Sequence, residues 1–369
     1  MTDTPVPLVD LGAQHAQVAD EVAEGWAAIL ARTAFVGGAA VKDFEAAYAD
    51  YIGATHCIGV GNGTDAIEFA LRALGIGAGD ECVVPANTFI ATAEAVARTG
   101  ATVVLADCDE TTALLDPAAA GAAVTSRTKA ILPVHLYGQA APVEAIRAAV
   151  GDVPIVEDAA QSQGAKRNGE SAGTLGVLAA TSFYPGKNLG AYGDAGAVLT
   201  SDPDLAVAVR LLGEHGSPRK YEHTVLGFNS RMDALQAVVL SAKLRRLDEW
   251  NDQRRAAADR YAALLADVDG VVAPVTAEGN EHVWHLYVVR VAERDRVLAD
   301  LHAGGIGAGI HYPTPVHLTG AFAHLGQGAG AFPASETLAG EILSLPLFPG
   351  ITAAQQERVV EVLAKAVAQ

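Results

Sequence analysis

Between residues 56 and 200, short apolar runs alternate with Ala-rich amphipathic stretches. The apolar runs have the length and residue types of buried strands. We predict strands at Cys57–Val60, Glu81–Pro85, Thr102–Ala106, Ala130–Val134, Pro154–Glu157, Ala180–Phe183 and Ala197–Thr200. Helical stretches such as Asp65–Leu74, Ala91–Arg98 and Val143–Val150 lie between them. This alternation indicates a mostly parallel sheet covered on both faces, and ligands of such sheets bind beyond the carboxyl ends of the strands.

The pattern changes on either side of this region. The other predicted elements are helices at Val18–Ala31 and Val41–Tyr51, one or two helices over Ser230–Val268, a strand at Trp284–Val291, a helix at Arg294–Ala303 and a closing helix from Ala353. The elements after residue 268 would form a smaller lobe of their own. We therefore predict an α/β protein with a large domain over residues 1–245 and a small C-terminal domain over residues 246–369.

Charge and composition narrow the possible partners. The formal net charge is −18, and proteins that hold nucleic acid through its phosphates need a basic surplus. The start of the chain lacks the regions of a signal peptide, and the uncharged stretch 303–335 is interrupted by Gly, Pro and His. Cys57, Cys82 and Cys108 border apolar runs, which indicates buried reduced thiols. We expect a soluble cytoplasmic protein with no nucleic-acid or membrane partner.

The first strand end with unusual residues is Gly61–Asp65. Small residues at the start of a helix leave backbone N–H groups open to an anion, and Thr64 adds a hydroxyl donor. The same pattern also describes an ordinary turn in which Asp65 favours the helix start. By itself this segment leaves both interpretations open.

A second strand end carries two acids, Glu157 and Asp158, which need partners if they are buried. Successive residues of a strand face opposite sides, so the two carboxylates should have different partners. Asp158 could pair with a protonated ring nitrogen or simply cap a helix.

The third strand end, Thr181–Gly190, contains Lys187 in a Gly-rich turn with no other charge between Glu170 and Asp194. A partly desolvated lysine has a lowered pKa and becomes an amine nucleophile for Schiff-base chemistry. The other lysines stand among polar neighbours, and we predict that they lie on the surface: Lys42, Lys129, Lys166, Lys220, Lys243 and Lys365.

Together the three strand ends supply an anion site, an acid and an amine. Pyridoxal phosphate requires these groups, because it binds through a lysine Schiff base and an acidic partner to its ring nitrogen. We predict that Lys187 holds this cofactor and that Asp158 keeps its ring nitrogen protonated.

The chain also resembles the DegT/DnrJ/EryC1/StrS family of nucleotide-sugar aminotransferases nearly from end to end. The resemblance rests on motifs in the family order: Val6–Asp10, Gly61–Asp65, Pro85–Phe89, Glu157–Gln161, Ser182–Gly190 and Gly227–Asp233. It implies the aspartate-aminotransferase fold, with a large domain on a mostly parallel seven-stranded sheet and a smaller α/β domain. It also implies a homodimer.

The resemblance assigns a cofactor role to individual positions. Lys187 corresponds to the Schiff-base lysine and Asp158 to the partner of the pyridine nitrogen. The remaining correspondences are Gln161 for the phenolic oxygen, Phe89 for stacking on the ring, Gly63, Thr64 and Ser182 for the phosphate, and Asn229 for a phosphate contact from the neighbouring subunit. No metal is implied, and His282 and His285 would face opposite sides of a strand.

Two motifs resemble enzymes that aminate C3 of a dTDP-linked keto-6-deoxyhexose with L-glutamate as donor: Ser182–Pro185 and Ile310–Leu318. This likeness makes Tyr184, His311 and Tyr312 sugar contacts, with Tyr221 on a substrate-side loop. The alternatives are amination at C4, a non-transaminating member of the family, and a regulator that keeps the fold without catalysis. Sugar dehydratases of the family that resemble this chain have histidine in place of the lysine, which argues against that activity.

Overall fold

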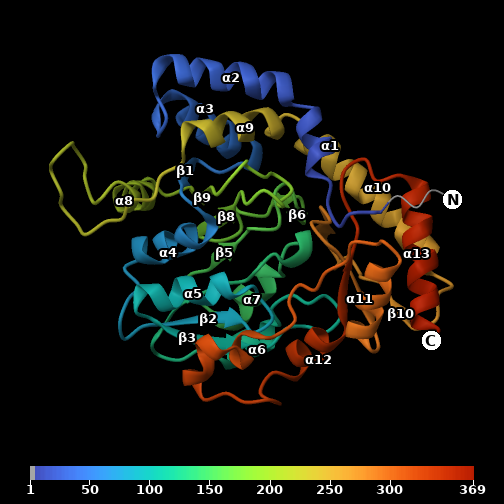
Figure 1. Cartoon of the computed structure of the whole chain (residues 1–369). Helices are drawn as coiled ribbons and strands as arrows, with labels where there is room; N and C mark the ends of the chain where they lie inside the picture. The colour runs from blue at the N-terminus through green and yellow to red at the C-terminus, as the bar shows by residue number, and fades with distance from the viewer. Residues whose placement is uncertain (1–4) are drawn as a thin grey trace.

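The computed structural model of the chain describes residues 5–369 (Figure 1). The expectation about a signal peptide was drawn from residues 1–5, of which residues 1–4 lie outside the described part. The strands predicted for the large sheet are β1 (His56–Val60), β2 (Glu81–Pro85), β3 (Thr102–Ala106), β4 (Thr128–Ile131), β5 (Val156–Asp158), β8 (Leu178–Ser182) and β9 (Gly196–Thr200). Each predicted strand is therefore present, with ends that differ by a few residues.

The helices of the same region are α1 (Leu11–Ala16), α2 (Ala19–Arg32), α3 (Gly38–Ile52), α4 (Gly63–Ala73), α5 (Ile90–Thr99), α6 (Pro117–Ala122), η1 (Leu136–Gly138), α7 (Val143–Val150), α8 (Pro203–Gly213) and α9 (Ala234–Leu244). The later part of the chain contains α10 (Leu247–Leu265), β10 (Val271–Val272), β11 (Asn280–Glu281), β12 (Tyr287–Val291), α11 (Arg294–Ala303), η2 (Val316–Leu318), η3 (Gly320–Leu325), α12 (Pro333–Glu341), β13 (Ile342–Leu345) and α13 (Ala353–Val367). Two short strands, β6 (Lys166–Arg167) and β7 (Glu170–Ser171), pair with β11 in a small separate sheet.

The strands form two hydrogen-bonded groups, ordered β1-β9-β8-β5 and β3-β2-β4. Single parallel bridges from Ile131 to Ile155 and from Val134 to Asp158 connect the two groups, so the one seven-stranded sheet stays a prediction. The pairs β5–β8, β2–β3 and β2–β4 are parallel, whereas β9 is antiparallel to both β1 and β8. β9 follows β8 after a loop instead of a crossover helix, and such a return gives antiparallel pairing.

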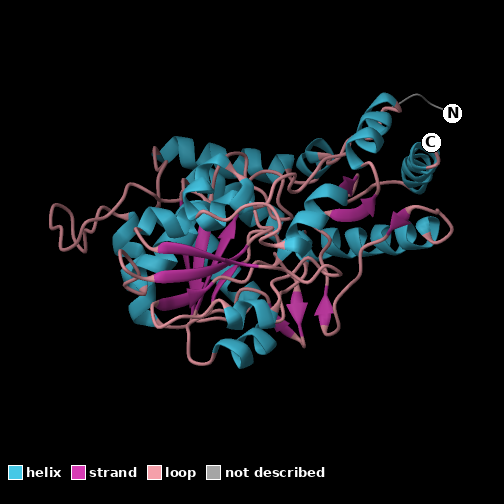
Figure 2. Cartoon of the chain, turned by 90° about the horizontal axis from the view of Figure 1, so that it is seen from below, coloured by secondary structure: helices cyan, strands magenta, loops and turns pink. Residues whose placement is uncertain are grey.

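The large sheet is buried on both faces. β2 and β9 are buried at every position, which explains why they read as continuous apolar runs. Val84 of β2 packs with Phe69 of α4 and Val96 of α5, while the adjacent Val83 packs with Ile146 of α7. Figure 2 shows helices on both sides of these strands.

The second hydrophobic core is formed mainly by the C-terminal part of the chain. It surrounds the sheet β10-β12-β13 and runs from Ala257 to Ala366, with Val6 added from the N-terminal segment. The division at residue 245 stays a prediction. The segment that contains η2 and η3 belongs to the first core instead, because Val316 and Phe322 pack there.

An extended arm connects α8 to α9 and comprises residues 214–229. A bridge between Glu214 and Asn229 closes its base, and the arm projects beyond α8 in Figure 1. Leu226 is 95% exposed and Tyr221 is 84% exposed, so the arm presents several apolar side chains to solvent. Within residues 5–369, every helix is too short or too polar to span a lipid bilayer.

Candidate active site

Lys187 lies in the turn that follows β8, and its side chain is partly buried. Its backbone N–H donates to the carbonyl of Tyr184 at 2.8 Å, which folds the turn back on itself. Burial lowers the pKa of the Lys187 ammonium to about 8, and the negative charge of Asp158 opposes this shift. The sequence prediction of a partly desolvated lysine near an acid is therefore confirmed.

Asp158 occupies the last position of β5 and is buried. Its Oδ2 accepts a hydrogen bond from the Thr92 hydroxyl at 2.8 Å, and its Oδ1 accepts the N–H of Ala160 at 3.1 Å. Burial raises the pKa of Asp158, whereas these hydrogen bonds and the nearby charges of Lys187 and His135 oppose that shift. The hydrogen bonds favour the carboxylate that a protonated ring nitrogen would need.

Glu157 points to other partners, as the strand alternation predicted. Its carboxylate lies 2.7 Å from Nε2 of the buried His135. It also accepts the N–H groups of Gly173 at 2.8 Å and Gly176 at 2.6 Å. The backbone N–H of Ala141 points at Nδ1 of His135, so the imidazole donates to Glu157 through Nε2. Glu157 thus holds loops behind the site and leaves Asp158 facing it.

Gly63, Thr64 and Ser182 form the candidate phosphate site. Asn62 caps α4 by accepting the N–H of Asp65 at 2.9 Å, so the helix begins at Gly63. A Cβ on Gly63 would lie only 2.6 Å from Cβ of Ser182, which shows that the helix start and the end of β8 are in close contact. Backbone N–H groups at a helix start attract anions. The Asp65 carboxylate has other partners: it accepts a hydrogen bond from the Ser230 hydroxyl at 2.7 Å and forms an ion pair with Arg98.

Gln161, Tyr312 and Phe89 form a connected group. The Gln161 Nε2 donates to the Tyr312 hydroxyl at 3.1 Å, and the ring of Tyr312 lies 5.0 Å from that of Phe89. The Gln161 Oε1 accepts the N–H of Tyr137 at 2.6 Å. Phe89 is 49% exposed, so part of its side chain is open to a ligand.

His311 adjoins this group and interacts electrostatically with Lys187. Its Nδ1 lies 2.8 Å from the hydroxyl of Ser344, and its carbonyl accepts the hydroxyl of Tyr137 at 2.5 Å. Burial and the charge of Lys187 lower the pKa of His311 to about 4, so its imidazole is neutral at pH 7.

The remaining predicted contacts are Tyr184, Tyr221 and Asn229. Tyr184 is 59% exposed, and Tyr221 lies on the arm with 84% of its surface exposed. Asn229 lies at the base of the arm and accepts a hydrogen bond from Arg231 at 2.7 Å.

The sequence did not reveal several residues of the site. Thr92 and Tyr137 touch the predicted groups only because distant segments meet, and Tyr137 also adopts a left-handed backbone with φ of 61°. The prediction that Lys243 lies on the surface is wrong, because it is buried against Gly190. Cys57, Cys82 and Cys108 are buried free thiols, as predicted.

The two histidines set aside as metal ligands have other partners. His282 stacks on Trp284 with ring centroids 3.8 Å apart, and its Nδ1 accepts the Trp284 N–H at 2.8 Å. Nδ1 of His285 lies 3.3 Å from Oδ1 of Asn188. Residues 5–369 contain no cluster of three or more potential metal ligands.

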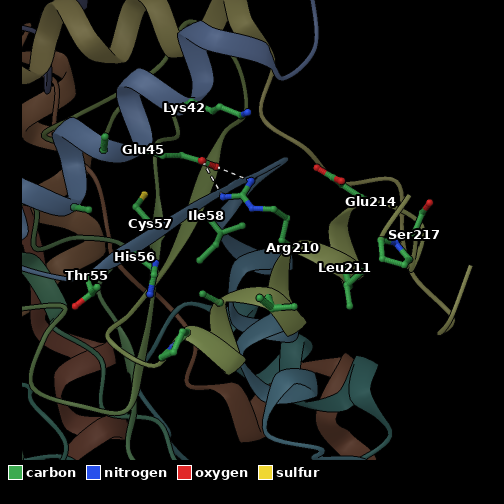
Figure 3. Close-up of a pocket in the computed structure, with 16 residues that line it drawn as sticks. Lys42, Glu45, Thr55, His56, Cys57, Ile58, Arg210, Leu211, Glu214 and Ser217 are labelled. Atoms are coloured by element: carbon green, nitrogen blue, oxygen red, sulfur yellow. Dashed lines mark hydrogen bonds and ion pairs between the residues drawn. The ribbon is translucent and has the colours of Figure 1, made fainter. Parts of the chain in front are cut away.

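A separate cavity of about 610 Å³ lies between α3, β1 and α8 (Figure 3). An ion pair of 2.9 Å between Arg210 and Glu45 crosses it, and Glu45 also accepts the N–H of Gly59 on β1. None of the predicted site residues lines this cavity. The chemistry gathers instead at the ends of β5 and β8.

The residues at those strand ends fit pyridoxal phosphate. An amine with a lowered pKa interacts with a buried carboxylate, and the absence of a side chain at Gly63 lets the start of α4 approach Ser182. Phe89 offers an apolar ring that packs beside Tyr312, the partner of Gln161. This set supplies an amine, a ring-nitrogen partner, an anion site and a stacking surface, which are the groups that the cofactor needs.

Comparison with known proteins gives an independent result. The profile of the DegT/DnrJ/EryC1/StrS aminotransferase family matches residues 17–364. A dTDP-3-amino-3,4,6-trideoxy-alpha-D-glucose transaminase of Streptomyces venezuelae is 44% identical, over 97% of this chain and 96% of that protein. A pleiotropic regulatory protein of Geobacillus stearothermophilus is 47% identical, over 98% of both chains.

The fold has a close counterpart among solved structures. The crystal structure of DesV from S. venezuelae, in complex with a ketimine intermediate, superposes with a TM-score of 0.96. The two sequences are 43% identical, and the match covers 99% of each chain. This chain and DesV therefore share one fold, including the part that carries the candidate site.

Proposed function

We propose that this chain, which belongs to the DegT/DnrJ/EryC1/StrS aminotransferase family, transfers an amino group from L-glutamate to C3 of a dTDP-linked 3-keto-6-deoxyhexose. The products would be a dTDP-3-amino-3,6-dideoxyhexose and 2-oxoglutarate. The enzyme is a pyridoxal-phosphate-dependent aminotransferase of nucleotide-linked keto sugars. The observation that carries the proposal is the Lys187 amine, whose pKa is lowered to about 8 beside the buried Asp158.

Bound pyridoxal phosphate supplies an electron sink for the α-carbon of the amino donor. Asp158 would hold the proton on the ring nitrogen, and the hydrogen bonds from Thr92 and Ala160 keep its carboxylate in place. Lys187 would hold the cofactor through its amine, and the same amine in its neutral form would take the proton from the donor α-carbon as a general base. Because the pKa of Lys187 is about 8, a larger fraction of its amine is neutral near pH 7 than in a lysine with the ordinary pKa of about 10.4.

Tyr184, His311 and Tyr312 are proposed to bind the sugar. The His311 imidazole is neutral, and its Nδ1 is engaged by Ser344, so its Nε2 remains for a sugar hydroxyl. Two facts support C3 as the position of amination: the likeness in Ser182–Pro185 and Ile310–Leu318, and the name of the S. venezuelae transaminase.

We propose that the active enzyme is a homodimer. The 214–229 arm exposes Leu226 and Tyr221 to solvent in the single chain, and exposed apolar side chains on a projecting segment favour a protein partner. Insertion of the arm into a second copy would bring Asn229 to the partner's phosphate site and Tyr221 to its sugar site. Such exchange of identical segments suits a twofold-symmetric interface.

Product analysis tests the proposed substrate. The purified enzyme, L-glutamate and a panel of dTDP-linked and UDP-linked 3-keto and 4-keto sugars are incubated, and the aminated carbon is identified by NMR. We expect amination at C3 of the dTDP-linked 3-keto-6-deoxyhexose, and no product from Lys187→Ala. A C4 amino sugar as the main product would favour the alternative function, amination of the nucleotide sugar at C4. A chain with cofactor but no product from any sugar would favour the regulatory role suggested by the G. stearothermophilus relative.

A further inference from the structure

Lys243 on α9 is a buried charged group that the proposed mechanism does not use. Its side chain is 3% exposed, and its Nζ donates to the carbonyl of Gly190 at 2.6 Å. The same Nζ lies 4.6 Å from the ring centre of Tyr192. Burial lowers the pKa of Lys243 to about 8, and no carboxylate within residues 5–369 forms an ion pair with it. A buried ammonium without a carboxylate partner weakens a fold, so a methionine of similar length would pack there at lower cost.

The carbonyl that Lys243 holds belongs to the turn that carries Lys187. Gly190 ends this turn, and a Cβ at that position would lie 2.3 Å from the carbonyl oxygen of Pro185. The turn is therefore closed tightly between Pro185 and Gly190, with Lys187 in its middle. The N–H of Ala191 donates to the carbonyl of Phe183 at 2.8 Å and fixes the closure.

Two further contacts hold the turn from the side of α9 and α10. The Asn188 amide donates to Oδ1 of Asn251 at 2.9 Å, and the Tyr192 N–H donates to Oε1 of Gln236 at 2.8 Å. Lys243 is the charged member of this set, and a charged donor gives the strongest of the three hydrogen bonds. Its position on a helix offers a rigid support for the turn.

We propose that Lys243 is a positioning residue for Lys187, because its ammonium holds the Gly190 carbonyl and so fixes the turn from which Lys187 reaches the cofactor. This inference rests on the proposed role of Lys187. Lys243 does not touch the cofactor or the substrate in this assignment. Its contribution is the geometry of the turn.

The test compares Lys243→Met with Lys243→Arg, which keeps a charged donor, and with Lys365→Met, which alters an exposed lysine on α13. Three quantities are measured: the affinity of the apoenzyme for pyridoxal phosphate, the rate of the half-reaction with L-glutamate at saturation, and the thermal unfolding midpoint. We expect Lys243→Met to lose about tenfold in cofactor affinity and in the saturated rate, with the KM for glutamate little changed. Lys243→Arg should recover most of both losses, and Lys365→Met should match the parent enzyme.

The outcomes separate positioning from simple stabilisation. A lower unfolding midpoint with normal affinity and rate per folded site would overturn the proposal, as would equal losses in the Met and Arg variants. If Lys243→Met does not fold, the Arg variant decides, because a positioning role requires near-parental affinity and rate in it. Pyridoxal phosphate bound to a lysine as a Schiff base absorbs visible light. A parent enzyme that shows no such visible absorption band after the cofactor is added would contradict the proposed function itself. If the parent enzyme shows the absorption band and Lys243→Met has the parental cofactor affinity and saturated rate, only the inference about Lys243 is overturned.

Discussion

At the scale of single residues, Asp158 shows how burial and hydrogen bonding oppose each other. Burial favours its neutral form, while Thr92, Ala160 and Lys187 favour the carboxylate. In Asp158→Asn the single amide oxygen can accept one of the two hydrogen bonds that reach the carboxylate, and the charge is lost. We expect the saturated rate with L-glutamate to fall at least roughly 100-fold while the protein stays folded. Stopped-flow measurement of the half-reaction checks this, with the exposed Asp152→Asn as control, and a loss of less than threefold would contradict the assigned role.

The pKa of Lys187 gives a prediction about pH. The amine attacks the cofactor aldehyde only when it is neutral, and its folded-state pKa of about 8 lies below the ordinary value of about 10.4. The rate of cofactor capture by the apoenzyme should therefore rise with pH and level off above about 8. Formation of the visible band, followed in buffers from acid to alkaline pH, measures this midpoint. A rate that continues to rise up to about pH 10 would mean that the amine is not desolvated.

The residues of the site differ in how far the sequence could predict them. Lys187 stands out because no other charge lies near it along the chain, and Asp158 because an acid ends an apolar strand. Lys243 has ordinary helical neighbours, and its burial arises from Gly190 and Tyr192, about fifty residues away. Tyr137 likewise joins the site through tertiary contacts alone. The pattern of polar and apolar residues along the sequence indicates only the local environment of a side chain. It cannot predict burial or contacts that depend on segments far away in the sequence.

At the scale of elements, the start of α4 must come close to the end of β8. In Gly63→Ala the new Cβ would lie 2.6 Å from Cβ of Ser182, so the helix start or the strand end has to move. We expect cofactor affinity to fall at least tenfold, although alanine is the better helix former. Gly340→Ala on α12 is a matched control, because nothing lies within 4 Å of its Cβ. Equal affinities in the two variants, measured by titration of the apoenzymes, would rule out a phosphate site at Gly63.

The strands could be predicted because buried β-branched runs between helices have few other interpretations. The direction of β9 could not, since it depends on the connection from β8 making no crossover. The packing of η2 and η3 on the first core was also missed. The segment from 303 to 335 has no formal charge and little periodicity, so nothing in it indicates which core it joins.

At the scale of the whole molecule, the arm predicts that each active site is shared between two chains. Lys187→Ala and Asn229→Ala should each be nearly inactive as pure homodimers. After unfolding and refolding together, half of the dimers would be mixed, and each mixed dimer would have one intact site. Activity should then return to about a quarter of the parental value. Mass spectrometry of the refolded sample shows whether mixed dimers have formed. If they have formed and the mixture stays inactive, Asn229 serves the site of its own chain.

The proposed role of Lys187 can be tested directly by finding which lysine anchors the cofactor. The holoenzyme is reduced with borohydride, digested and analysed by mass spectrometry, which locates the pyridoxyl group on a single side chain. We predict that the group is found on Lys187 and that the visible band disappears on reduction. A pyridoxyl group on another lysine, such as the buried Lys243, or its absence from every peptide would contradict the central assignment.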